Sequence, residues 1–461
     1  MIGVRSGFDP ERNDVHKPTT ARERIQKLIF SAQQSPKLFL IVVLLFAIAL
    51  RLSAVFATSS YHVDNGDNHF AFGWEMGRVA RSLAEGRGFS SPLPSPTGPT
   101  AIVGPIYPLL LALIFKIFGV YSTASALVIL VIQSVLSSFT CLFVYLCGRD
   151  TTGEATGKVA AIVWAVFPLS IFFTVTRVWE TSVTALLAAA LFWCMLDLRH
   201  SLSASRWAMT GALIGFAALI NTSLVVLAVP FGLVALWRNR LRFFRPAAVA
   251  ALTCMTVVSP WLMRNYFEFG KFVLRSNFPL EFRLGNNEWS PGQKLEDLHP
   301  AKSPYLNQHW HDVGEMRFMA EERALNSRFL ATEPGLFAFA TVNRVVNYWT
   351  GAWIVPTVDF PNRWPIIIGT SIISLLGFLG VRRMFYDGNS AASMYTGCLF
   401  IYPLLYYVTT SQPRFYYSIT PLLLVPGTFW VLHRLNGTAG PMPAKERTVR
   451  ETGSGTLGRA V

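Results

Sequence analysis

Apolar segments long enough to cross a lipid bilayer recur along this chain, and they limit its fold more than any other feature. A membrane helix needs about 20 mainly apolar residues. Only 14% of the residues are charged, whereas a soluble protein carries nearer a quarter. The chain is therefore predicted to be an all-α, polytopic membrane protein with about ten transmembrane helices, within a range of roughly 9–13. The predicted spans are residues 38–57, 123–147, 158–176, 179–197, 207–221, 222–237, 246–263, 364–381, 391–410 and 416–433.

Basic residues gather in every second connection between these segments, and this pattern orients the chain. Lysine and arginine are enriched in loops that remain in the cytoplasm. Both termini are predicted to be cytoplasmic, with 1–37 preceding a signal anchor at 38–57 and a disordered tail at 436–461. The basic residues then placed on the cytoplasmic side are Arg149, Lys158, Arg199, Arg206, Arg238, Arg240, Arg242, Arg245, Arg382, Arg383, Arg434, Lys445, Arg447 and Arg450.

Two long connections are expected on the opposite, outer side of the transmembrane domain that the sequence predicts over residues 38–435. They are residues 58–122 and 264–363. The second mixes acidic and basic residues evenly, which predicts a small folded unit. Residues 106–118 and 335–356 are apolar, but each contains a basic residue, so both are predicted to form helices in the membrane interface.

Other features of the composition argue against several classes of protein. The five cysteines lie in apolar segments without partners at metal-ligand spacing, so we interpret them as small hydrophobic residues. The net charge of +14 comes largely from residues that flank membrane helices and does not indicate nucleic-acid binding. The span interiors are nearly free of charge, with Gln133 and Asn221 as the main polar exceptions. A proton-coupled transporter usually keeps ionisable residues inside the membrane.

The first outer loop carries acidic residues that run into an amphipathic helix, predicted over 68–86. One face of this helix is apolar and can rest on the membrane domain. Glu75 and Arg78 fall on another face, where they would point into a cavity beneath the loop. Asp64 and Asp67 precede the helix. Helix capping by the aspartates and an ion pair between Glu75 and Arg78 are the structural alternatives to a catalytic role.

Three further outer segments carry charged residues that could meet this loop. Arg177 and Glu180 stand at a tight turn between two spans, within the sequence TRVWETS. Arg264 follows the span that ends near Trp261, and Arg414 lies between two spans against the positive-inside trend. Arginine binds oxyanions with two parallel hydrogen bonds, so these residues are candidate ligands of a lipid phosphate. Arg51, near the outer end of the first span, is a further candidate. Capping and snorkelling at the membrane surface are the alternatives.

Three pieces of the chain resemble bacterial members of the GT-C glycosyltransferases. They are ARSLAEGRGFS with PIYPLLLALIFKIFG, SPWLMRNYFEFGKFVLRSNFPLEFRLGNN, and PRFYYSITPLLL. This superfamily includes the dolichyl-phosphate-mannose protein mannosyltransferases and the lipid A aminoarabinose transferase. The resemblance covers about residues 38–435. It implies a helical bundle in the cell (inner) membrane, with catalytic loops on the outer face.

The resemblance also implies a reaction and roles for particular residues. The donor would be a sugar on a polyprenyl phosphate, transferred with inversion to a lipid, glycan or protein acceptor. A first-loop acid would activate the acceptor and Glu180 would assist, while arginines would hold the leaving phosphate. The candidate bases are Asp67, Glu75 and Asp64, and the candidate phosphate ligands are Arg264, Arg414, Arg177, Arg78 and Arg51.

One position departs from the family pattern and leaves the choice of base open. Members often carry an aspartate upstream of the alanine of the A-R-x-L segment, where this chain has Phe72. The sequence contains no Asp-x-Asp pair or clear ligand set, so we predict that no metal or other cofactor is required. Two further hypotheses stay open: a transporter or flippase of a lipid-linked sugar, and a non-catalytic membrane protein of envelope assembly. No motif in 264–363 identifies the sugar or the acceptor.

Overall fold

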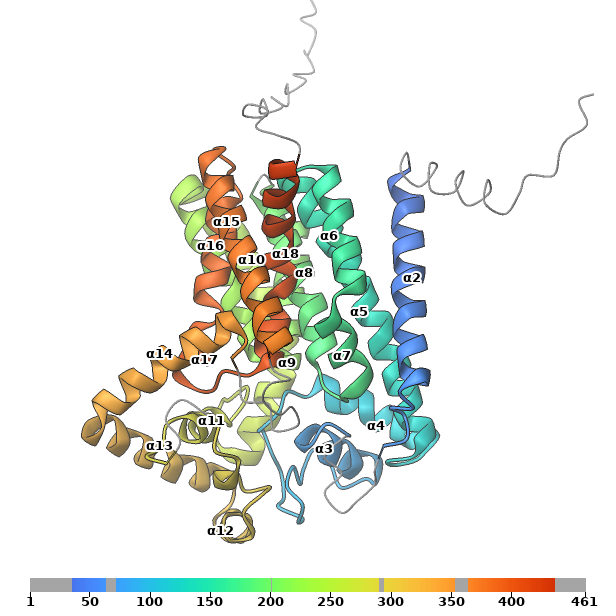
Figure 1. The fold of residues 1–461 in the computed structure, drawn as a ribbon. Helices are drawn as coiled ribbons and strands as arrows, with labels where there is room; N and C mark the ends of the chain where they lie inside the picture. Colours follow the sequence, from blue (N-terminus) through green and yellow to red (C-terminus); the bar gives the residue numbers. More distant parts are fainter. Residues whose placement is uncertain (1–34, 64–71, 200, 290–293, 353–363, 436–461) are drawn as a thin grey trace, which may run out of the picture.

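The computed structural model describes residues 35–63, 72–199, 201–289, 294–352 and 364–435, and this part of the chain is built from helices (Figure 1). Within it, the β-pairing is one isolated bridge between Ser90 and Pro99. The predicted all-α, polytopic fold is confirmed. The proposed disordered tail and the two aspartates of the first loop, Asp64 and Asp67, lie outside the described residues.

Six helices of the described part are long and apolar enough to cross a membrane. They are α2 (Pro36–Ala57), α5 (Thr123–Thr151), α8 (Thr181–Leu198), the Phe244–Phe269 part of α10 (Ala228–Phe269), α15 (Trp364–Tyr386) and α18 (Pro413–Leu435). A seventh span results if α6 (Glu154–Val166) and α7 (Pro168–Thr176), which are bent by 43° at their junction, are counted as one.

The remaining three predicted spans lie in shorter apolar helices. These are α9 (Ala204–Ile220), the segment Thr222–Leu233 that joins η2 (Thr222–Leu227) to α10, and the pair α16 (Ala392–Ile401) and α17 (Leu404–Val408). A helix rises 1.5 Å per residue, so none of them alone matches a bilayer core of about 30 Å. The number of spans identified by length and composition is therefore six or seven. Ten were predicted.

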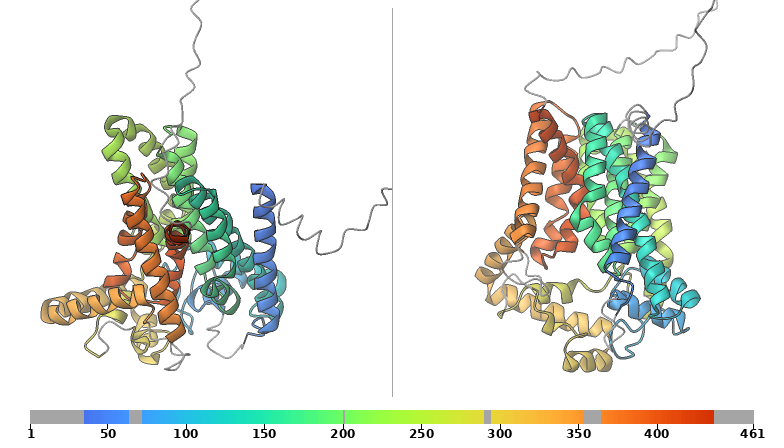
Figure 2. Two further views of the ribbon diagram at one scale, coloured as in Figure 1. Left: turned by 45° about the horizontal axis from the view of Figure 1, so that its top comes forward. Right: turned by 45° about the vertical axis from the view of Figure 1, so that its right-hand side comes forward.

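Helices α8 and α18 form the centre of the bundle, whereas α2 lies at its edge (Figure 2). Within their spans, 83% of α8 and 78% of α18 are buried by protein, against 22% of α2. Small residues permit this close packing. A side chain on Gly380 of α15 would collide with the backbone at Pro426 of α18, and one on Gly377 would collide with Leu423.

The other helices gather at one end of the bundle, here called the loop face (Figure 1). They are α3 (Glu75–Ala84), α4 (Ile106–Phe118), α11 (Phe278–Gly285), η3 (Glu296–Leu298), α12 (Pro304–Val313), α13 (Glu315–Thr332) and α14 (Pro334–Thr350). The start of α2 and the end of α18 lie at the opposite end. On α14, Phe339, Val342 and Val346 are exposed while Arg344 is buried, as in a helix that lies along a lipid surface.

A tight backbone contact sets the start of α3. Gly73 has a φ of 85° and Trp74 a φ of 51°, and a Cβ on Gly73 would lie 2.5 Å from the carbonyl oxygen of Val178. Only glycine permits this approach without a steric clash. The start of the first-loop helix is thereby held against the α7–α8 turn. Arg78, which was predicted to look into the cavity, is instead only 2% exposed.

Arg264 and Glu315 fasten the two long loops together. Arg264 donates hydrogen bonds to the carbonyl oxygens of Thr100 (2.7 Å) and Phe89 (2.8 Å). The carboxylate of Glu315, at the first residue of α13, accepts from the backbone N–H of Ala101 at 2.8 Å and from the Ser276 hydroxyl at 2.6 Å. The contacts of Arg264 with Thr100 and of Glu315 with Ala101 join residues more than 150 positions apart, so the loop face folds as one unit with the end of α10.

Arg344 also connects distant segments of the loop face through hydrogen bonds. Its guanidinium is fully buried and donates to the carbonyl oxygens of Tyr407 (2.6 Å) and Gly285 (2.7 Å) and to Asn286 Oδ1 (2.8 Å). The Asn286 amide in turn donates to the carbonyl oxygen of Val408 at 2.8 Å. These bonds tie α14 and the end of α11 to the segment that leads into α18, which carries Arg414.

Candidate functional site

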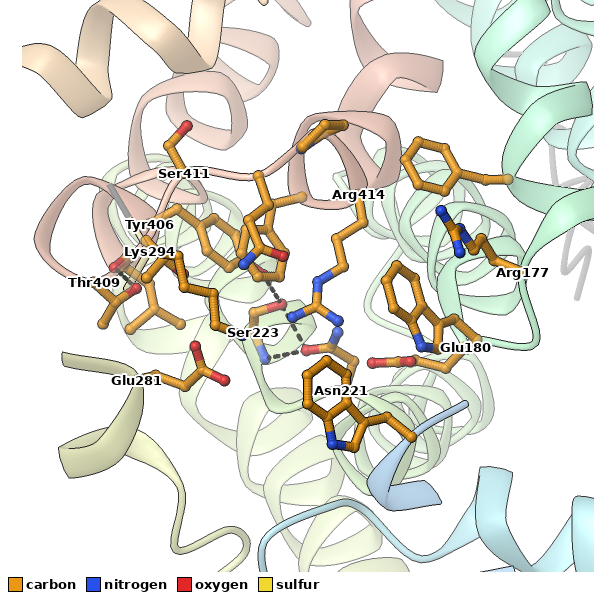
Figure 3. A pocket seen from close by; sticks show the side chains of 18 of the residues that line it. Arg177, Glu180, Asn221, Ser223, Glu281, Lys294, Tyr406, Thr409, Ser411 and Arg414 are labelled. Carbon is orange, nitrogen blue, oxygen red and sulfur yellow. Dashed lines mark hydrogen bonds between the residues drawn. The ribbon is translucent and has the colours of Figure 1, made fainter. Parts of the chain in front are cut away.

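A cavity of about 1350 Å³ lies between the loop face and the membrane bundle (Figure 3). Its polar part collects charged side chains from five separate stretches of the chain. They are Glu75, Arg177, Glu180, Arg275, Glu281, Lys294, Glu296, His299 and Arg414. Of the sequence-predicted site residues, the structure therefore brings together Glu75, Glu180, Arg177 and Arg414.

The same cavity has an apolar arm between two membrane helices. The apolar arm is lined by Phe172 and Phe173 of α7 and by Ile366, Gly369 and Ile373 of α15. A Cβ on Gly369 would meet no atom within 4 Å. The cavity is therefore lined both by charged side chains and by apolar side chains of two membrane helices.

Glu75 enters the cavity from the first residue of α3. About 22% of its side chain is exposed, and its Oε1 lies 3.1 Å from Nε2 of His299. Burial by itself raises the pKa of this carboxyl, but the contact with His299, a backbone N–H and the nearby Lys294 outweigh burial and lower the pKa to about 2. Glu75 is therefore a firmly held carboxylate at neutral pH.

Glu180 directly precedes α8 and also lines the cavity. It is only 8% exposed, and its Oε2 is buried without a hydrogen-bond partner among the described residues. Burial raises the pKa of this carboxyl, opposed by the charges of Arg414 and Arg275. Its environment thus differs from that of Glu75: the charge is less stabilised and one oxygen is free to accept a proton.

Gln133 of α5 holds the turn that carries Glu180. Its amide nitrogen donates to the carbonyl oxygens of Thr174 (3.1 Å) and Arg177 (2.9 Å), and its Oε1 accepts from the backbone N–H of Trp179 at 3.2 Å. Gln133 thus forms hydrogen bonds with three backbone groups at the turn between α7 and α8, where helix ends leave such groups without partners. Gln133, one of the two polar residues noted within the predicted spans, therefore supports the turn that carries Glu180.

Arg414, at the second residue of α18, points its guanidinium into the cavity between Asn221 and Glu180 (Figure 3). Its Nε is buried and has no hydrogen-bond partner among the described residues. The guanidinium lies 4.8 Å from the ring centroid of Trp179, over which Arg177 also lies at 6.0 Å. Two cations on one indole, facing an open cavity, form a favourable site for an anion.

The floor near Arg414 is a hydrogen-bonded network at a break between helices. Asn221 ends α9 and its Oδ1 accepts from the backbone N–H (3.1 Å) and hydroxyl (2.8 Å) of Ser223. Tyr406 of α17 donates to the Ser223 hydroxyl at 2.8 Å. The network fixes polar groups at the position where the apolar bundle meets the charged chamber.

Arg51, Arg78 and Arg264 do not line the cavity. Arg51 is fully buried in the bundle and donates to Ser170 Oγ (2.7 Å) and to the carbonyl oxygens of Ala165 (3.0 Å) and Ala47 (3.1 Å), across the break between α6 and α7. Arg264 is engaged by loop carbonyls, as described above, and Arg78 lies near the Pro92 carbonyl oxygen at 3.4 Å. These contacts give all three guanidinium groups structural roles.

Two lining residues, His299 and Lys294, were missed by the sequence analysis. They stand singly in the second long loop, and no spacing or motif distinguishes them from other polar loop residues. Arg275 lies in the segment SPWLMRNYFEFGKFVLRSNFPLEFRLGNN but was not among the candidate site residues. Asn221 did carry a signal, since it was one of the two polar exceptions in the spans. Within the described part of the chain, no group of three His, Cys, Asp or Glu side chains is placed to hold a metal ion.

Part of the chain matches the sequence model of a known protein family. Residues 101–263 match the sequence model of the family described as dolichyl-phosphate-mannose-protein mannosyltransferase. This stretch runs from the end of the first long loop through the turn with Glu180 to the end of α10. No curated protein sequence matches the chain.

Solved structures with a similar fold include several of one archaeal enzyme. Oligosaccharyltransferase AglB from Archaeoglobus fulgidus, in complex with an inhibitory peptide and a dolichol-phosphate, has a TM-score of 0.50 at 16% identity, covering 89% of this chain and 52% of AglB. A structure of the Archaeoglobus fulgidus oligosaccharyltransferase with Zn and sulfate gives a TM-score of 0.51 at 15% identity, covering 86% and 49%. The chain thus spans about half the length of these proteins.

A third structure, ArnT from Cupriavidus metallidurans bound to undecaprenyl phosphate, has a TM-score of 0.39 at 11% identity, covering 89% of this chain and 78% of ArnT. The family match is limited to residues 101–263, and the similarity to AglB shows a shared fold. The chain is a multi-pass membrane protein.

Proposed function

We propose that this chain transfers a sugar from a polyprenyl-phosphate donor to an acceptor at the outer face of the bacterial inner membrane. One observation carries the proposal: a single cavity joins a chamber of facing carboxylates and arginines to an apolar arm between membrane helices. The chamber suits a phosphate and a reacting sugar, and the arm suits a hydrocarbon tail. The acceptor is a lipid, a glycan or a protein with a free hydroxyl.

The orientation follows from the charges at the two ends of the bundle. The loop face mixes acids and bases, whereas the other end carries the basic connections predicted to be cytoplasmic. We therefore place the loop face outside the cytoplasm, and both chain termini inside. A donor held in the membrane would then meet its acceptor on the outer side.

Arg414 and Arg177 are proposed to bind the donor phosphate. Both line the cavity beside the apolar arm, and the Nε of Arg414 has no partner among the described residues. The structurally similar AglB was solved with a dolichol-phosphate, a lipid of the same chemical class. Arg51, Arg78 and Arg264 are proposed to support the fold, because their donors are used by protein groups outside the cavity.

In the proposed reaction the acceptor hydroxyl oxygen attacks the anomeric carbon, and the bond from that carbon to the phosphate oxygen breaks. The bonding electron pair leaves with the phosphate, which gains a negative charge, and the hydroxyl proton passes to a carboxylate. Because charge develops on the phosphate, Arg414 and Arg177 stabilise the transition state more than the bound donor. Attack opposite the leaving group inverts the anomeric configuration.

Of the two described carboxylates, Glu180 is better suited to take the proton. A general base works best when its pKa lies near the working pH, and burial raises the pKa of Glu180. Its Oε2 is also unpartnered. Glu75, held ionised by His299, would instead stabilise the positive charge that develops on the sugar ring. This exchanges the roles suggested by the family resemblance. Asp64 and Asp67 stay candidates beside these two, and we propose no required metal or other cofactor.

The test is a transfer assay with the purified protein in lipid nanodiscs. A panel of undecaprenyl-phosphate sugars is supplied with candidate acceptors, and release of undecaprenyl phosphate and formation of the glycoside are followed together. We expect both products in equal amounts, with inverted anomeric configuration. The amide variants E75Q, E180Q, D64N and D67N are measured alongside.

Two results would overturn the proposal. If all four amide variants keep full activity, no carboxylate of this site activates the acceptor. If the protein moves the lipid-linked sugar across liposomes without forming a glycosidic bond, it is a flippase. A retained anomeric configuration would reject the single-displacement mechanism.

A further inference from the structure

His299 lies between the two long loops at the wall of the cavity. It is 2% exposed, and its ring packs 5.5 Å from the ring of Trp74, the residue before α3. One ring nitrogen, Nε2, contacts the Glu75 carboxylate at 3.1 Å. The other, Nδ1, accepts a hydrogen bond from the backbone N–H of Ala301 at 3.0 Å. Both nitrogens of the imidazole are therefore occupied by protein groups.

The contact with Ala301 fixes the tautomer. A backbone N–H can only donate, so Nδ1 must carry its lone pair and not a proton. In the neutral ring the single proton then lies on Nε2, where it points to Glu75. A second proton on Nδ1 would face the N–H of Ala301 and break that hydrogen bond. The geometry therefore places the N–H donor of His299 at Nε2, where it faces the Glu75 carboxylate.

We propose that His299 is a positioning residue that fixes the Glu75 carboxylate in the cavity and keeps it ionised, and that it does not relay protons. A relay would need His299 to accept a proton at one nitrogen, but Nε2 already carries one and Nδ1 is blocked by Ala301. The positioning of Glu75 by His299 does not depend on the proposed function. Only its consequence, that Glu75 acts as a fixed charge during sugar transfer, rests on the proposed function.

The charges around the pair are consistent with this role. Arg78, Glu180 and Lys294 interact electrostatically with Glu75, and Lys302 lies over the Trp74 ring. The other charged residues that line the same cavity are Arg177, Arg275, Glu281, Glu296 and Arg414. Lys294 adds to the stabilisation of the Glu75 charge, and Lys302 lies 5.3 Å from the Trp74 ring. The second long loop thus sets the ionisation state of an acid on the first.

Two substitutions separate the functions of the two ring nitrogens. In H299N the side-chain oxygen can still accept from Ala301, but no donor reaches Glu75. In H299Q the longer amide can place an N–H₂ group near the position of Nε2. The matched control is H309N, because His309 contacts Glu321 at 2.6 Å and does not line the cavity.

The readout is the protonation of Glu75 itself, which needs no transfer activity. Infrared spectra across a pH titration show the carbonyl band of a protonated carboxylic acid, and the band of Glu75 is assigned by its loss in matched E75Q variants. We expect H299N to raise the midpoint by about one to two pH units, which corresponds to the loss of a charge-assisted hydrogen bond. H299Q is expected to stay near the wild type, and H309N is expected to have no effect.

An unchanged midpoint in folded H299N would overturn the proposal. Nitrogen-15 NMR of histidine-labelled wild-type protein gives an independent test if H299N does not fold. It should show His299 protonated on Nε2, whereas a proton on Nδ1 would reject the inference. Failure of the wild type to transfer any sugar would contradict the proposed function alone and leave the shift in midpoint unaffected.

Discussion

Glu75 and Glu180 line one cavity, yet their surroundings are opposite. Glu75 receives a hydrogen bond from His299 and lies near Lys294, and the pKa of its carboxyl is lowered to about 2. Glu180 is almost fully buried, has one oxygen without a partner in the described structure, and has a raised pKa. When the environments of two carboxylates in one site shift their pKa values in opposite directions, the two groups are suited to different roles.

The arginines show the same division. Arg264 and Arg344 direct their guanidinium groups to backbone carbonyls and connect distant segments. Arg414 keeps a buried Nε unpartnered at the wall of a cavity. A charged residue whose donors are all used stabilises the fold, whereas one with free donors is available for a ligand. The comparison therefore separates structural from functional charges within one loop face.

Among the arginines, the largest effect is expected from removing Arg414. R414Q should lower the transfer rate roughly 100- to 1,000-fold, because a preorganised positive charge near the leaving phosphate is lost. R264Q is the matched control. It removes bonds to Phe89 and Thr100, so it should lower the unfolding temperature while the folded protein keeps its transfer rate. Equal rates in R414Q and the wild type would reject the division of the arginines.

A smaller effect is expected from filling the apolar arm. G369L places a side chain where a Cβ now meets no neighbour, on the wall formed by α15. Crowding of about 1–2 kcal/mol should raise the KM for a long-chain donor roughly tenfold. A donor with a short lipid chain should be little affected, because it does not reach the blocked part. If both donors lose affinity equally, the arm does not hold the lipid tail.

The pH profile of transfer should report Glu180 and not Glu75. Activity requires the ionised base, so kcat/KM should fall as the pH drops through the raised pKa of Glu180. Glu75, with a pKa of about 2, stays ionised throughout this range. The acid limb should therefore persist in E75Q and disappear from the residual activity of E180Q. If E75Q instead removes the acid limb of the pH profile, Glu75 is the general base and Glu180 is not.

The smallest effects are on stability, and they should have opposite signs. The folded pKa of Glu75 is depressed, so its stabilisation is present above the ordinary pKa and is lost as the pH falls toward about 2. E75Q should destabilise the protein near pH 7 by about 1 kcal/mol, the difference between a charged and a neutral hydrogen bond.

The pKa of Glu180 is raised, so its ionised form opposes folding and stability should increase as the pH falls through that pKa. E180Q should therefore raise the unfolding temperature near pH 7. Thermal unfolding of both variants in one detergent is the measurement. Shifts of the same sign in E75Q and E180Q would contradict the comparison between the two acids.

Much of the fold could be predicted from hydrophobicity, because the energetic cost of placing polar groups in lipid acts on every membrane span alike. Helices occur at all ten predicted positions, and the amphipathic first-loop helix is present as α3. The breaks were harder to foresee. The bend between α6 and α7 coincides with Pro168, which lacks an N–H group to continue a helix, and Arg51 donates across the bend from another helix. Arg51 is distant in sequence, so this contact leaves no local pattern.

The site could be predicted only in part, for the same physical reason. Glu180, Arg177 and Arg414 were identified because charges at the ends of membrane helices are conspicuous. Glu75 was identified because it falls on the polar face of the amphipathic first-loop helix. His299 gave no signal, since its role arises from a backbone N–H and a carboxylate that folding brings together. Sequence also could not separate Arg264 from Arg414, because the difference lies in which carbonyl groups surround each guanidinium.

The most direct test of the account is the single-turnover rate of sugar transfer in E75Q and E180Q, measured side by side with the wild type near pH 7. The account predicts transfer by the wild type with release of polyprenyl phosphate. E180Q should be slower by roughly 100- to 10,000-fold, the usual contribution of a general base, and E75Q should lose less. An E180Q rate equal to that of the wild type, or a greater loss in E75Q, would contradict it.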